Sequence, residues 1–123
     1  MENIDKTFTD AAKDYVERLK NCFDQNIFNN IEILSKEILK VWESENNIFI
    51  CGNGGSSANA QHIANDFIYG VGVSKNKNHK NIKGLKIEAL TSNANIVTCL
   101  ANDIGYENIF SYQLSVKAKE GDL

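Results

Sequence analysis

Residues 48–69 read IFICGNGGSSANAQHIANDFIY and join three different patterns. Residues 48–51 form a short apolar run, which is typical of a buried parallel strand. The glycine-rich residues 52–57 predict a tight turn, and residues 58–69 repeat apolar side chains at helical spacing. A strand, a glycine loop and a helix therefore follow one another, as in an α/β domain with a parallel sheet.

The chain on either side extends this pattern. Residues 5–44 carry two apolar stripes with spacings of three and four, which predict two leading amphipathic helices. The later chain predicts a strand at 87–90, helices at 93–100 and 107–117, and the start of a further strand at Leu123. Two strands alone would leave the sheet with an open edge. We therefore interpret residues 1–123 as the N-terminal portion of a single α/β domain, with its sheet and glycine loop beginning at residue 47 and its C-terminal part missing.

Composition narrows the class of protein. The net charge of -3 gives no basic surface for nucleic acid or for an anionic membrane. The first twenty residues contain no unbroken apolar run, so neither a secretory signal nor a membrane span is expected, and we expect a cytoplasmic protein. Cys22, Cys51 and Cys99 stand in no CxxC spacing. We expect each of them to be a small buried apolar residue rather than part of a disulfide or zinc site.

The glycine loop itself suggests a ligand. A loop that joins a strand to a helix presents free backbone N–H groups and the positive end of the helix dipole, which attract a phosphate or sugar oxygens. It is neither the dinucleotide fingerprint nor a P-loop, because no GK[ST] follows. The alternative is that these glycines serve only the sterics of a tight turn.

His62 and Asp66 are four residues apart on the predicted helix, so their side chains share one face. An imidazole beside a carboxylate can hold a metal ion, and the carboxylate can also act as a general base on a carbon next to a carbonyl. The alternative is an exposed surface pair worth about 0.2–0.5 kcal/mol.

The segment CGNGGSSANAQHIANDF resembles the glycine-loop segment of the sedoheptulose-7-phosphate isomerases, which belong to the sugar-isomerase (SIS) family. LANDIGYENIFSYQL and the terminal EGDL resemble two later segments of the same enzymes. The resemblance implies an SIS fold and a homotetramer with sites at subunit interfaces. It also implies a sugar-phosphate substrate, sedoheptulose 7-phosphate, which is isomerised to D-glycero-D-manno-heptose 7-phosphate for surface glycans.

The resemblance also implies roles for single residues. His62 matches a zinc-ligating histidine, and Asp66 stands where those enzymes have a glutamate that binds the metal and serves as general base, with one zinc ion per site. Substrate contacts are implied at Asn53, Gly54, Gly55, Ser56, Asn102 and Asp103. Moving a proton between two carbons through an enediol requires such a base and an electrophile for the enediolate.

Several features differ from that pattern. Aspartate is one methylene shorter than glutamate, and Gly70 stands where an arginine is usual. The lysines of the 70–84 loop could replace that charge near a phosphate, or they could simply be solvated: Lys75, Lys77, Lys80 and Lys83. The phosphate loop, a glutamine ligand and a second histidine of those enzymes lie beyond Leu123, so we expect residues 1–123 alone to be inactive. The alternative functions are a non-catalytic SIS module, binding a sugar phosphate or a replication-initiator protein, and a plain α/β fragment.

Overall fold

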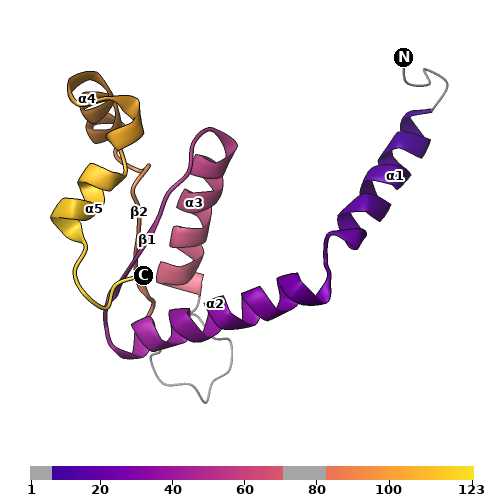
Figure 1. The fold of residues 1–123 in the computed structure, drawn as a ribbon, viewed down its shortest axis with the longest axis horizontal. Coiled ribbons are helices and arrows are strands. Elements are labelled where there is room, and N and C mark those ends of the chain that lie inside the picture. Colours follow the sequence, from indigo (N-terminus) through magenta and orange to yellow (C-terminus); the bar gives the residue numbers. More distant parts are fainter. Residues whose placement is uncertain (1–6, 71–82) are drawn as a thin grey trace. The chain divides into compact units, whose positions relative to one another are not determined.

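The computed structural model describes residues 7–70 and 83–123. The described residues fall into two compact units, divided between Lys36 and Glu37. Lys75, Lys77 and Lys80, which the sequence offered as phosphate partners, lie outside the described residues. The elements, in chain order (Figure 1), are α1 (Phe8–Asn21), α2 (Gln25–Glu43), β1 (Asn47–Ile50), α3 (Gly55–Asn65), the π-helical turn η1 (Asp66–Gly70), β2 (Lys86–Ala89), α4 (Ala94–Asp103), the 3-10 turn η2 (Tyr106–Asn108) and α5 (Ser111–Lys117).

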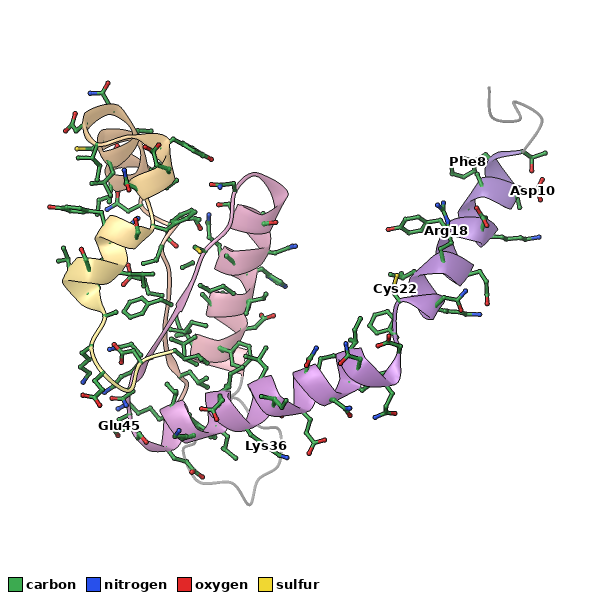
Figure 2. All side chains as sticks on the ribbon, in the orientation of Figure 1. Phe8, Asp10, Arg18, Cys22, Lys36 and Glu45 are labelled. Atoms are coloured by element: carbon green, nitrogen blue, oxygen red, sulfur yellow. The ribbon has the colours of Figure 1, made fainter. Side chains whose placement is uncertain are left out.

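The first unit contains α1 and the first part of α2. Thr7 caps α1, because its Oγ1 accepts a hydrogen bond from the Asp10 amide at 3.2 Å. Asp24 does the same for α2 by accepting from the Ile27 amide at 2.9 Å. No residue of α1 is buried, and Phe8 is 90% exposed. Figure 2 shows the side chains of α1, among them Phe8 and Arg18, projecting from a helix that buries none of them. The two leading helices predicted from the apolar spacing are present, and no residue of α1 is buried within its own unit.

In the second unit the sheet is parallel, as the sequence predicts. β1 pairs with β2 in the register Asn47 with Lys86 through Ile50 with Ala89. The amide of Leu90 extends this ladder by donating to the Ile50 carbonyl at 2.9 Å. Leu123 pairs with β1 through Asn47 and Phe49 instead, with hydrogen bonds of 3.0 and 2.8 Å. Since alternate residues of a strand direct their N–H and C=O groups to opposite edges, Leu123 lies on the other side of β1 from β2.

Helix α3 lies beside this small sheet (Figure 1) and packs on it through alanines. Ala60 and Ala64, one turn apart, meet Ala89 of β2. Side chains this small let the helix backbone come close to the strands. A second buried cluster joins Val41 of α2 to the sheet through Ile48 and Leu85. These two clusters fix the strand, loop and helix that carry the candidate site.

Several element boundaries differ from the sequence prediction by a few residues; the helix predicted at 93–100, for example, ends at Asp103. The helix after the glycine loop begins at Gly55 rather than Ala58, and its α-helical part ends at Asn65, after which the chain widens into η1. The helix predicted at 107–117 is divided into η2 and α5. Gly105 has a φ of 96°, which side chains rarely adopt, and this break starts η2.

The prediction of buried cysteines is wrong. All three cysteines are exposed: Cys22, Cys51 and Cys99. Cys22 caps a helix that buries no residue, and Cys51 leaves the sheet at the end of β1. Over the described residues, no helix has both the length and the apolar character needed to cross a bilayer.

Candidate functional site

The glycine loop between β1 and α3 is held in a tight conformation. Gly54 has a φ of 57°, in the left-handed region that favours glycine. A Cβ on Gly52 would lie 2.6 Å from the backbone of Ser56, so the loop can close onto the first turn of α3 only with glycine there. Within the loop the Ser56 amide donates to the Asn53 carbonyl at 3.1 Å. These constraints place the start of α3 directly after the sheet.

The start of α3 has unused donors. The amides of Ser57 and Ala58 both donate to the Gly54 carbonyl, at 3.1 and 3.3 Å. The amides of Gly54 and Gly55 form no hydrogen bond with any described residue. Unpaired amides at the positive end of a helix dipole are suited to an anionic or strongly polar ligand.

A cleft of about 220 Å³ opens where β1 and β2 end. This is the edge of a parallel sheet at which α/β proteins usually bind ligands. One wall comes from the glycine loop and the first turn of α3. The other comes from the turn after β2, from α4 and from the segment before α5. The lining residues are Gly52, Asn53, Gly54, Ser57, Thr91, Ala94, Val97, Thr98 and Phe110.

Two threonines in the cleft wall differ in their hydrogen bonding. Thr98 Oγ1 donates back to the Ala94 carbonyl at 2.8 Å, within α4. Thr91 Oγ1 is buried and has no hydrogen-bond partner among the described residues. An unpaired buried hydroxyl costs roughly 1–3 kcal/mol. Thr91 is therefore a polar group of the cleft that lacks a partner.

His62 and Asp66 lie together but away from the cleft. The Nε2 atom of His62 is 3.5 Å from Oδ2 of Asp66, and the two side chains are 75% and 62% exposed. Neither lines the cleft. With a rise of about 1.5 Å per residue, the eight residues from Gly54 to His62 separate the pair from the amides by roughly 12 Å along the helix. The two side chains lie together as predicted. Within this single chain, however, they do not lie close to the loop amides.

The second predicted substrate pair lies at the C-terminal end of α4. Asn102 Nδ2 donates to Asp103 Oδ1 at 2.8 Å, and Cys99 Sγ donates to Asp103 Oδ2 at 3.4 Å. The hydrogen bond and the negative charge of Asp103 raise the pKa of the Cys99 thiol. Both Asn102 and Asp103 are exposed and neither lines the cleft. Cys99 is accordingly held as a thiol rather than as a reactive thiolate.

A metal ion would find only part of its ligand set here. Among residues 7–70 and 83–123, no three His, Cys, Asp or Glu side chains come close enough to share an ion. His62 and Asp66 are chemically suitable zinc ligands, but a tetrahedral zinc site takes four, and a catalytic one usually takes three from protein. The described residues can therefore provide two ligands of such a site.

Seven residues that line the cleft were not among the predicted substrate contacts: Gly52, Ser57, Thr91, Ala94, Val97, Thr98 and Phe110. A signal for Thr91 was present, since it stands just after the second predicted strand and the carboxyl ends of parallel strands meet at one edge. Thr98 and Phe110 carried no such signal, because they reach the cleft only through the packing of α4 and η2.

Comparison with known proteins agrees with the fold. Residues 7–123 match the SIS domain family, and the chain therefore belongs to that family. It is similar to the phosphoheptose isomerase of Aneurinibacillus thermoaerophilus, with 37% identity over 100 residues, which is 81% of this chain and 47% of that protein. A phosphoheptose isomerase of Synechocystis is 35% identical over 108 residues, covering 88% of this chain and 52% of its own length.

A solved structure, phosphoheptose isomerase GmhA from Neisseria gonorrhoeae, superposes with a TM-score of 0.57 at 27% sequence identity. The match covers 88% of this chain and 57% of that one. The chain spans about half the length of the curated relatives it matches. The α/β fold predicted from the sequence is confirmed by this similarity.

Proposed function

We propose that this chain forms part of a phosphoheptose isomerase, which converts sedoheptulose 7-phosphate into D-glycero-D-manno-heptose 7-phosphate for surface-glycan synthesis. The observation that carries the proposal is the imidazole–carboxylate pair, 3.5 Å apart, on the helix that begins at the glycine loop lining the cleft. The similarity to phosphoheptose isomerases supports it.

Each part of this arrangement has a task in the reaction. The amides of Gly54 and Gly55, with the Asn53 side chain, would bind and orient oxygens of the sugar phosphate. Asp66 would remove the proton that moves between C1 and C2, and His62 would hold that carboxylate in place. Asn102 and Asp103 would contact the substrate from the end of α4.

A zinc ion is part of the proposal. His62 Nε2 and the Asp66 carboxylate would supply two of its ligands, and the remaining ligands would come from outside the described residues. Such an ion, when bound, polarises the carbonyl oxygen and stabilises negative charge on it.

Because His62 and Asp66 lie away from the cleft, we consider how assembly of several subunits could complete their site. In one protomer both side chains face solvent, so a second surface must approach them to exclude water from the reacting carbons. We propose a cytoplasmic homotetramer in which sites form between subunits. The exposed apolar side chains of α1 give a surface that association could bury.

The experiment uses the full-length protein and sedoheptulose 7-phosphate, with the aldose product followed by NMR in the presence and absence of zinc. Asp66→Asn should lower kcat by about 10²–10⁴-fold, the range of general-base catalysis. Asp66→Glu should retain activity because the carboxylate is kept. Glu32→Gln is the matched control, since Glu32 is an exposed helical carboxylate paired with Lys36. Equal activity of Asp66→Asn and wild type would refute the catalytic assignment.

One observation favours a second function, a non-catalytic sugar-phosphate sensor. Among the described residues, the cleft is lined by backbone amides and hydroxyls and by no carboxylate, which suits binding rather than proton transfer. Calorimetry distinguishes the two cases. A sensor would bind the sugar phosphate with equal affinity in wild type and Asp66→Asn and would give no product with either.

A further inference from the structure

A wide turn begins at the candidate base. The Asp66 amide bonds back into α3, to the carbonyls of His62 and Ile63, and residues 66–70 form the π-helical turn η1. Single π-turns within helices are rare, and they occur frequently at functional sites. Here the change of helical geometry starts at the residue that carries the carboxylate.

The segment before β2 holds this turn in place. The Leu85 amide donates to the Phe67 carbonyl at 3.0 Å. The half-buried Phe67 side chain packs against a core cluster that includes Ile48 and Leu85. Only one peptide bond separates Asp66 from Phe67, so fixing Phe67 from both its backbone and its side chain limits how Asp66 can turn.

Gly84 makes this contact possible. A Cβ built on Gly84 would overlap the carbonyl oxygen of Ile68 and would lie 2.6 Å from the carbonyl carbon. Both atoms belong to the backbone of η1, so no side chain can move aside to make room. A residue larger than glycine must push β2 and the π-turn apart.

We propose that Gly84 is a positioning residue for Asp66: its missing side chain lets the chain before β2 lock the π-turn that holds the Asp66 carboxylate beside His62. Gly84 touches neither member of the pair and acts through the backbone of residues 67 and 68. The inference rests on the proposed function for its kinetic consequence, but the geometry can be tested without turnover.

The test compares Gly84→Ala with Gly70→Ala in the full-length protein. Gly70 lies in the same turn, has an ordinary φ, and a Cβ there would meet no atom of the described residues within 4 Å. Misplacing a reacting group by about 1 Å can cost roughly 100-fold in rate. Gly84→Ala should therefore lower kcat by about 100-fold with KM nearly unchanged, and Gly70→Ala should behave as wild type.

A double variant separates positioning from general damage. If Gly84 acts through Asp66, then Asp66→Asn with Gly84→Ala should be no slower than Asp66→Asn alone. Multiplied losses in the double variant, or an unchanged kcat in Gly84→Ala, would overturn the proposal.

A readout without substrate keeps the two proposals distinct. The ¹³C chemical shift of the Asp66 carboxyl carbon should change in Gly84→Ala and stay constant in Gly70→Ala. The same chemical shift in wild type and both variants would refute the positioning role, even if wild type proves to be an active isomerase. If wild type forms no aldose, the isomerase proposal fails while this readout still tests Gly84. If Gly84→Ala does not fold, replacing the Leu85 amide by an ester removes only its bond to Phe67, and the same shift should then move.

Discussion

Asp122 Oδ1 accepts a hydrogen bond at 2.8 Å from the backbone amide of Asn47, which is 75 residues earlier in the chain. Its other oxygen accepts from the Lys119 amide at 3.0 Å. One carboxylate thus joins the start of β1 to the turn that places Leu123 beside that strand. The backbone donor of Asn47 is the main cause that lowers the pKa of Asp122.

This lowered pKa predicts how stability depends on pH. A carboxyl group whose pKa is lower in the folded state stabilises the protein fully above its ordinary value, about 3.9, and loses that effect as pH falls through the folded value. Asp122→Asn should therefore lower the urea midpoint near pH ~6 and have little effect well below pH ~3. A constant difference between the two proteins across this range would contradict the assignment.

The Cys99–Asp103 contact predicts slow alkylation of this thiol. Because Asp103 raises the pKa of Cys99, little thiolate forms at mildly basic pH. In a background with Cys22 and Cys51 changed to serine, Asp103→Asn should speed the reaction of Cys99 with iodoacetamide. Mass spectrometry measures the rate. Equal rates with and without Asp103 would show that the 3.4 Å contact does not form in solution.

Replacing the buried side chain of Gln113 should cause a large loss of stability. Its Nε2 donates to the carbonyls of Leu90 and Ile109, at 3.1 and 2.8 Å, and so ties α5 to the end of β2. Gln113→Met keeps the size of the side chain but leaves both carbonyls unpaired, which should cost about 1–3 kcal/mol in the free energy of unfolding. Gln25→Met is the exposed control and should change that free energy by less than about 0.5 kcal/mol. Urea denaturation compares the two.

The same substitution, threonine to valine, should affect stability differently at positions 91 and 98. Thr91→Val removes a buried hydroxyl that has no partner among the described residues, so the unfolding free energy should stay equal or rise by about 1 kcal/mol. Thr98→Val removes a hydroxyl that already bonds to a carbonyl and should bring no such gain. Thermal denaturation of both variants checks this. A clear loss of stability in Thr91→Val would mean that its hydroxyl has a partner in solution.

Patterns among neighbouring residues were sufficient to predict part of the site. Gly54 needs a positive φ, and the run before it is apolar on both faces, so the strand and the loop could be predicted from neighbouring residues. The spacing of His62 and Asp66 was also sufficient to place them on one helical face, 3.5 Å apart. These features depend on interactions within a few residues.

Burial could not be predicted in the same way. Cys99 and Cys51 have side chains that are usually buried, yet both are exposed, because exposure depends on what covers an element rather than on its own residues. The cleft likewise needed Thr91 and Phe110, which are 19 residues apart in sequence, to meet the glycine loop.

By itself, the sequence determined the α/β class, the parallel strands and the helix that carries the His62–Asp66 pair, because turn chemistry and side-chain periodicity act over short distances. Only the tertiary structure decided that the glycine loop lines a cleft with no carboxylate among its described residues, and that Asp66 begins a π-turn held by the backbone near Gly84. Both follow from contacts between segments far apart in sequence, which local propensity does not encode.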